Sequence, residues 1–477
     1  MKGVGWSAAD AFLGQGVTFL VGIVLARLLS PAEYGLIGIC MIFTTVLSGI
    51  VDSGLSNSLI RKKVVTDDDY NTMFITNMLM SIVLFVLLYI TAPLIASFFS
   101  REELIVLIRV MGLILFFQAL SLVQYTRLTK RIDFKTKTKA SIIAAIVSGG
   151  IGIGMAYAGF GVWSLVGQKL SERLIYTLCL WVFNWWFPRC RFCLDSFHYM
   201  WGFGWKIMLA GLLNNIWKEL YQVVVGKFYS PATLGQYTRA RQFSHLFSTN
   251  LTNIIQRVTF PVLSNIQDDR ERLLSVYRRI IKMTMLVTAS GMFFLGAISE
   301  PLLYCLIGPK WHDATAYLPL ICITGSLYPL HAINLNMLQV QGRSDLFLGI
   351  EVVKKILSLG PLFIGVFIGI IPMLCTSVVI GVVAYFINSY YSGKLINYSS
   401  WMQIKDVAPF YGIALLIVLS VFFLKYLPLP TWTILLVQLV IGFSSFLFIC
   451  ITMHIREFKE LTLMIKNYYH HIRLRHR

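Results

Sequence analysis

Two stretches of this sequence, 200 residues apart, carry closely similar residues in the same order. The first reads Arg27-Leu-Leu-Ser-Pro-Ala-Glu-Tyr-Gly35, and the second reads Lys227-Phe-Tyr-Ser-Pro-Ala-Thr-Leu-Gly235. Each follows an apolar run that opens on Gly-x-Gly-Trp, at Gly3 and again at Gly202. Because two motifs recur in register, the sequence predicts an internal repeat of about 200 residues.

The composition around these motifs is that of a membrane protein. Hydrophobic residues make up 57% of the 477 residues and charged residues only 13%, whereas soluble domains carry about 25% charged residues. Apolar runs long enough to cross about 30 Å of hydrocarbon recur along the whole chain. Without the alternating pattern of a β-barrel, such runs must span as helices. The predicted fold class is an all-α polytopic membrane protein with about fourteen transmembrane helices, which excludes a soluble enzyme.

The repeat divides the predicted helices into four parts. A third pair of motifs, Arg131-Ile-Asp133 and Arg343-Ser-Asp345, follows the first two in the same order. We therefore expect two six-helix lobes, a terminal helix pair and a basic cytoplasmic tail, at residues 1–195, 196–395, 396–454 and 455–477. An even number of helices gives both lobes one orientation, so a pseudo-two-fold axis along the membrane normal relates them. Parallel repeats of this kind are typical of transporters that rock two halves about a central site.

The basic residues indicate the orientation. Lys and Arg total 41 against 22 Asp and Glu, a net charge of +19. Most of these cations fall in predicted loops on the side of the N-terminus, which predicts that both termini are cytoplasmic. The tail from Ile455 is expected to lie on the anionic inner leaflet. The basic clusters lack the aromatic platform that single-stranded nucleic acid needs, so no nucleic-acid partner is predicted.

The exits of the predicted first and seventh helices also resemble a known family. The segments Ala26-Arg-Leu-Leu-Ser-Pro-Ala-Glu-Tyr-Gly-Leu36 and Val225-Gly-Lys-Phe-Tyr-Ser-Pro-Ala-Thr-Leu-Gly-Gln-Tyr-Thr-Arg-Ala240 are similar to those of polysaccharide flippases. These are the Wzx-like oligosaccharide-lipid translocases of the multidrug/oligosaccharidyl-lipid/polysaccharide exporter superfamily. The resemblance covers essentially the whole chain, including the six-plus-six-plus-two helix count.

The resemblance implies a function and a location. It implies a flippase of the bacterial inner membrane that moves a polyprenyl-diphosphate-linked oligosaccharide by alternating access, for lipopolysaccharide or exopolysaccharide biosynthesis. Membrane lipids are the other expected partner, and the family context allows partners among other polysaccharide-assembly proteins. No cofactor is implied.

Charged residues inside the predicted spans are functional candidates, because a charge at bilayer depth costs several kcal/mol unless it meets a partner or a wet cavity. Lys169, Glu172 and Arg173 follow at i, i+3 and i+4, so they share one helix face. They either line a polar cavity or form an internal ion-pair network that joins two helices. The excess of cations over carboxylates favours the cavity.

A second polar row follows the predicted seventh span. Asn214, Lys218 and Gln222 are spaced by four residues, with Glu219 on the adjoining row. Arg and Lys suit a diphosphate because several charge-assisted hydrogen bonds can replace its lost hydration. The predicted substrate-binding residues are Arg27, Lys169, Arg173, Asn214, Lys218, Gln222, Arg239 and Arg241. The candidates for ion coupling, which can equally be structural partners of nearby cations, are Asp10, Asp52, Glu172 and Glu219.

Two other functions are weighed against the flippase. One is a multidrug or small-molecule exporter of the same superfamily. The other is a polytopic glycosyltransferase or ligase, which the short predicted outer loops disfavour. No catalytic residue or metal ligand is predicted, because Cys190 and Cys193 lack the second ligand pair that a zinc site needs.

Overall fold

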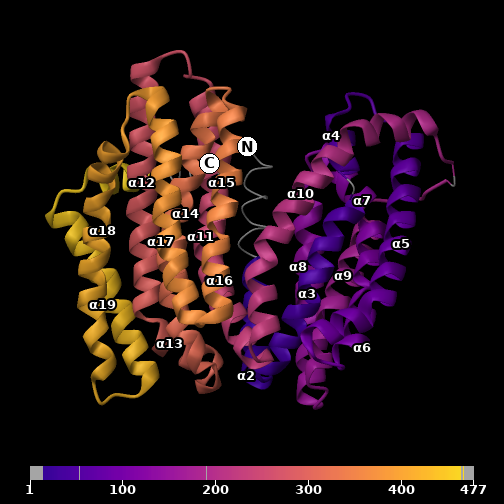
Figure 1. Cartoon of the computed structure of the whole chain (residues 1–477), viewed down its shortest axis with the longest axis horizontal. Coiled ribbons are helices and arrows are strands. Elements are labelled where there is room, and N and C mark those ends of the chain that lie inside the picture. The colour runs from indigo at the N-terminus through magenta and orange to yellow at the C-terminus, as the bar shows by residue number, and fades with distance from the viewer. Residues whose placement is uncertain (1–13, 53, 190, 464–465, 467–477) are drawn as a thin grey trace, which may run out of the picture. The chain divides into compact units, whose positions relative to one another are not determined.

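The computed structural model describes residues 14–52, 54–189, 191–463 and 466 (Figure 1). These described residues form helices joined by short connections, and no strand occurs among them. The all-helical expectation is therefore confirmed. Nine helical segments in the described part of the chain are long and apolar enough to cross a membrane. The count of about fourteen spans stays a prediction, and Asp10 lies outside the described residues.

Contacts between residues group the chain into two compact units, Met1–Thr238 and Arg239–Arg477. The border falls inside α11 (Pro231–Ser264), so the first turns of α11 belong to unit 1. The lobe border expected from the repeat, at residue 195, lies just after the first residue of α10 (Leu194–Phe228). Within unit 1, α10 packs against α3 (Pro31–Asp52), α4 (Leu55–Arg61) and α5 (Asp67–Phe99). The division into repeat lobes stays a prediction beside this grouping by contacts.

Unit 1 is a bundle in which α3 packs against α5, α7 and α9, and α8 packs along α9 (Figure 1). Gly152 permits the close contact between α8 and α9, because a Cβ there would lie 2.7 Å from Gln168 Cβ. Besides α10 and the start of α11, the helices of unit 1 are α2 (Gln15–Leu28), α3 (Pro31–Asp52), α4 (Leu55–Arg61), α5 (Asp67–Phe99), α6 (Leu104–Met111), α7 (Ile114–Lys130), α8 (Phe134–Tyr157) and α9 (Val162–Phe183).

The two repeated Ser-Pro-Ala motifs have the same local structure. Helices α2 and α10 end just before Leu29 and Tyr229, whose backbones are extended. Pro31 and Pro231 then open α3 and α11, a position where proline loses no helical hydrogen bond. In both copies a serine side chain caps the new helix, since the backbone N–H groups of Glu33 and Thr233 donate to the preceding serine hydroxyl at 3.4 and 3.1 Å.

The same motifs pack against each other within unit 1. A Cβ on Gly35 would lie 1.8 Å from the carbonyl oxygen of Pro231, and a Cβ on Gly235 would lie 1.9 Å from that of Pro31. Both distances are far below a van der Waals contact, so only glycine fits at either position. The contact is reciprocal, as expected when a two-fold axis relates two copies of one motif. We call it the glycine crossing.

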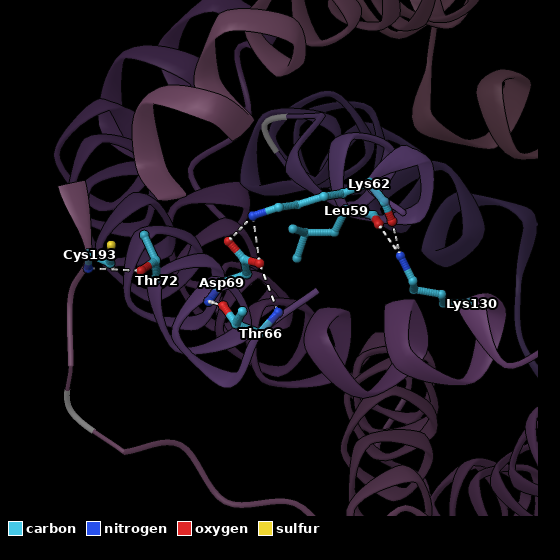
Figure 2. Close-up of polar contacts among 7 residues, drawn as sticks. All are labelled: Leu59, Lys62, Thr66, Asp69, Thr72, Lys130 and Cys193. Atoms are coloured by element: carbon cyan, nitrogen blue, oxygen red, sulfur yellow. Dashed lines mark hydrogen bonds and ion pairs between the residues drawn. The ribbon is translucent and has the colours of Figure 1, made fainter. Parts of the chain in front are cut away.

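A group of polar contacts around a buried carboxylate joins three elements of unit 1 (Figure 2). Asp69 is fully buried and accepts from the Lys62 ammonium at 2.8 Å through both oxygens. It also completes a capping box with Thr66 at the start of α5. Lys130, at the end of α7, donates to the carbonyl oxygens of Leu59 and Lys62. The loop after α4 and the end of α7 therefore lie together, as expected if these two basic segments are on the same side of the membrane.

In unit 2, α12 packs against α14 and α18, α14 also packs against α17, and α19 packs against α18. Asp406 of α18 accepts two hydrogen bonds from the Arg278 guanidinium of α12, at 2.7 and 2.9 Å, and one from Tyr398 at 2.6 Å. The helices are α12 (Arg270–Ala297), α13 (Ser299–Ile307), α14 (His312–Val340), α15 (Ser344–Leu357), α16 (Leu359–Phe367), α17 (Ile370–Ile396), α18 (Ser400–Phe422) and α19 (Thr431–Thr452), with short 3₁₀ turns at Pro309–Trp311 and Phe423–Tyr426.

Candidate functional site

A polar cavity of about 340 Å³ lies inside unit 1 between α3, α7 and α9. Its volume is in the range of ordinary ligand pockets, about 300–1,000 Å³. The four charged residues that line it, Asp52, Lys169, Glu172 and Arg173, were all predicted as site residues from the sequence. The remaining lining residues are Met41, Thr44, Thr45, Ser48, Gly49, Ile114, Gln118 and Leu122.

The three charges of α9 do not pair off completely. The Lys169 ammonium lies 3.0 Å from a Glu172 carboxylate oxygen, and the Gln168 amide donates to the same oxygen at 3.5 Å. In the described part of the chain, the Arg173 guanidinium has no ion-pair partner, and the residue is exposed. Lys169 and Glu172 pair with each other on their own helix and not with a neighbouring one. This arrangement favours the cavity over the helix-joining network.

The wall formed by α3 carries a row of oxygen-bearing side chains. Thr44, Ser48 and Asp52 are spaced by four residues and all line the cavity. Asp52 is the last residue of α3, and its carboxylate accepts a hydrogen bond from Ser56 of α4. Gly54 then reverses the backbone with a φ of +67° before α4 begins. This break falls within the candidate membrane span Pro31–Arg61, and helix breaks that line a cavity are a common construction for ion and substrate sites.

A second cavity of about 370 Å³ adjoins the first, because Gln118, Leu122, Glu172 and Arg173 line both. It adds Lys137 of α8, which is 7% exposed. The Lys137 ammonium lies 3.6 Å from the centre of the Tyr125 ring and 3.2 Å from the Thr129 hydroxyl. Across the two cavities, three cations face two carboxylates, so the joint site has a net positive formal charge.

Lys137, Gln118 and the α3 hydroxyls of Thr44 and Ser48 were not predicted as site residues from the sequence. Lys137 stands between Lys135 and Lys139, a pattern typical of a cytoplasmic loop. The Gln118 amide donates to the Ser48 carbonyl at 3.2 Å, while its buried oxygen has no hydrogen-bond partner among the described residues. The four-residue spacing of Thr44, Ser48 and Asp52 was visible in the sequence and follows the rule used for Asn214, Lys218 and Gln222.

The polar row of Asn214, Lys218 and Gln222 lies on α10, another helix of unit 1. Asn214 and Lys218 are exposed, and the Gln222 amide donates to Glu219 on the same helix. Asn215, on the adjoining row, comes close to α3, because a Cβ on Gly49 would lie 2.8 Å from its amide nitrogen. The adjoining row therefore reaches α3 at Gly49, which lines the first cavity.

The remaining predicted arginines are divided between the two units. Arg27 is exposed in the last turn of α2. Arg239 belongs to unit 2, where it is 5% exposed, donates to Gln242 and lies 5.8 Å from the centre of the Trp311 ring. Arg241 is partly buried on the same helix. Within the described residues, no group of three His, Cys, Asp or Glu side chains is arranged to hold a metal ion.

Comparison with known proteins relates this chain to polysaccharide biosynthesis proteins. Residues 24–316 match the model of a family described as polysaccharide biosynthesis protein. The succinoglycan biosynthesis transport protein ExoT of Rhizobium meliloti (strain 1021) is 26% identical over 329 residues, 69% of this chain and 67% of that protein. The lipopolysaccharide biosynthesis protein WzxC of Escherichia coli (strain K12) is 22% identical over 371 residues, 76% of this chain and 75% of that protein.

A solved structure has the same fold. The inward closed conformation of the lipid II flippase MurJ superposes with a TM-score of 0.73 and 15% sequence identity, covering 93% of this chain and 97% of that chain. At this identity the likeness concerns the fold. It confirms the expected polytopic helical class.

Proposed function

Because this chain belongs to the family of polysaccharide biosynthesis proteins, we propose that it flips a polyprenyl-diphosphate-linked oligosaccharide across the bacterial inner membrane. The family and the fold are those of transporters and not of enzymes. The observation that carries the proposal is the joint cavity of unit 1, where Lys137, Lys169 and Arg173 lie together.

The chemistry of this cavity suits the diphosphate more than the sugars. A diphosphate leaves water only if charge-assisted hydrogen bonds replace its hydration, and guanidinium and ammonium groups supply such bonds. Arg173 is exposed to the cavity without an ion-pair partner among the described residues, so no internal bond has to break before it binds. Asp52 and Glu172 would offset the cationic charge once the substrate has left, and either can carry a coupling ion.

In the proposed mechanism the site opens to one side of the membrane at a time. A continuous pore lined by cations would leak anions, so an outer barrier must be closed while the head group enters from inside. The glycine crossing is well placed for that barrier, since the charge bias puts Ser30 and Ser230 on the outer side. The two repeats would separate at the crossing to release the head group, while the lipid tail stays in the bilayer.

A reconstituted transport assay tests the function. The purified chain is placed in vesicles with fluorescent lipid-linked oligosaccharides from the host membranes, and an impermeant quencher reports their movement between leaflets. We expect faster movement of the diphosphate-linked form than of the same oligosaccharide on uncharged polyprenol, because only the former engages Lys169 and Arg173. Movement of a cationic dye without movement of the lipid-linked sugar would contradict the proposal and favour a multidrug exporter.

The proposed orientation gives a separate prediction. Single cysteines replacing the exposed Ser30 and Ser230 should react in intact cells with an impermeant thiol reagent, whereas a cysteine replacing the exposed Lys135 should not. A cysteine-free background removes the chain's own thiols, and permeabilised cells serve as the control in which Lys135→Cys must react. Labelling of Lys135→Cys in intact cells would overturn the cytoplasmic placement of this loop and of the termini inferred with it.

A further inference from the structure

Unit 2 has a basic pocket far along the sequence from the transport site. It encloses about 440 Å³ between α12 and the segment that follows α19. Its cations are Arg278, Arg279 and Lys282 of α12 and Arg456 of the following segment. The other lining residues are Ser275, Val276, Glu457 and Glu460. None of these residues takes part in the proposed transport of the lipid-linked oligosaccharide.

The wall formed by the C-terminal segment is fixed in place. Residues 456–463 are helical, and Ile455, Phe458 and Leu461 pack against the hydrophobic core of unit 2. The Phe458 ring meets Phe446 of α19 edge to face, with ring centres 6.0 Å apart. Packing of this apolar face holds Arg456 beside α12. The pocket is therefore built from two packed helices and not from a loose basic tail.

The two carboxylates that bond the pocket's cations are less exposed than those cations. Asp406 bonds Arg278 and Lys282, and its side chain is 10% exposed. Glu460 bonds Arg279 at 2.6 Å and Arg456 at 3.1 Å, and its side chain is 18% exposed, against 51% and 87% for the two arginines. Glu457 also lines the pocket, so its four cations face three carboxylates in all, and a net positive formal charge remains. The two more exposed arginines, Arg279 and Arg456, keep N–H donors that Glu460 does not occupy.

We propose that this pocket binds the phosphate of an anionic phospholipid head group, of which phosphatidylglycerol is the simplest example. After Lys282, α12 continues without a charged residue up to Ala297. The pocket thus lies where a membrane-spanning helix changes from charged to apolar, at the level of lipid head groups. One arginine side chain can donate two parallel hydrogen bonds to a phosphate group. Basic pockets beside transmembrane helices on the cytoplasmic side bind anionic head groups.

Lipid binding to paired variants distinguishes a specific pocket from general attraction to a charged membrane. In the pocket variant, Arg279→Gln and Arg456→Gln remove two lining cations. In the control variant, Arg272→Gln and Lys459→Gln remove two exposed cations from the same helices, neither of which lines the pocket. We expect about tenfold weaker binding of phosphatidylglycerol to the pocket variant in phosphatidylcholine nanodiscs, and less than about twofold weakening in the control.

A third variant should change the affinity for phosphatidylglycerol in the opposite direction. Glu460→Gln removes the carboxylate that competes for Arg279 and Arg456, so binding of phosphatidylglycerol should become tighter. A purely structural role of the cluster predicts weaker binding or none. Inorganic phosphate at millimolar concentration should not displace the lipid, because it lacks the acyl chains that add apolar burial. Equal loss in the pocket and control variants, weakening by Glu460→Gln, or displacement by phosphate would each overturn the lipid site.

Discussion

Replacement of Arg173 by glutamine is expected to stop flipping of the diphosphate-linked substrate without lowering the amount of protein in the membrane. The Arg173 guanidinium is exposed at the cavity of unit 1 and has no ion-pair partner in the described part of the chain. Its loss therefore leaves no carboxylate stranded. A charge-assisted hydrogen bond to phosphate contributes about 1.5–3 kcal/mol, so substrate affinity should fall by roughly ten- to a hundredfold.

Two matched variants separate binding from folding. Arg191→Gln removes an exposed arginine of unit 1 that does not line either cavity, so transport should be unchanged. Lys169→Gln breaks the 3.0 Å pair with Glu172 and leaves that carboxylate with only the long hydrogen bond from Gln168, which should lower the protein level as well as transport. If Arg173→Gln lowers the protein level and the added change Glu172→Gln restores it, the two residues form a structural pair and the binding role is wrong.

The residues of the site that could be predicted from the sequence are the charged residues that interrupt an apolar helix. Lys169, Glu172 and Arg173 interrupt an apolar run, and the structure places all of them on the cavity with Asp52. A charge in a membrane span needs a partner or water, so its presence alone is informative. The α3 hydroxyls carry no charge, and single Ser or Thr residues are common in membrane helices, where they bond to their own backbone as Thr44 does to Cys40.

Lys137 shows why some of the site could not be read from the sequence. It stands in a run of alternating Lys and Thr that looks like a solvated loop. In the structure Asp133 caps α8 just before it, and the helix carries Lys137 to the Tyr125 ring. The position of α8 beside α7 and α9 decides this, and that packing has no local signal. The two Ser-Pro-Ala motifs, in contrast, act locally on the backbone. Pro31 and Pro231 each open a new helix, so the two copies of the motif interrupt the helices at equivalent positions.

Substitution of alanine for Gly35 is expected to abolish transport, because the glycine crossing could no longer close. The new Cβ would lie 1.8 Å from the Pro231 carbonyl oxygen, a backbone atom that no side-chain rotation can move. Gly38→Ala is the matched control on the same helix. Its Cβ would lie 3.5 Å from Leu234 and Thr238, which is an ordinary contact. Both substitutions stabilise the helix by up to about 1 kcal/mol, because alanine has a higher helix propensity than glycine. A difference in transport between the two variants therefore reports on the glycine crossing alone.

The reciprocal contact makes the prediction stricter, because Gly235→Ala meets the Pro31 carbonyl at 1.9 Å and should have the same effect as Gly35→Ala. Disulfide formation between cysteines at Leu29 and Tyr229 measures closure directly. We expect that cross-link to stop flipping reversibly in the parent chain, and its yield to fall in both alanine variants but not in Gly38→Ala. If the cross-link forms fully and flipping continues, the repeats need not separate at the crossing, and the outer barrier must lie elsewhere.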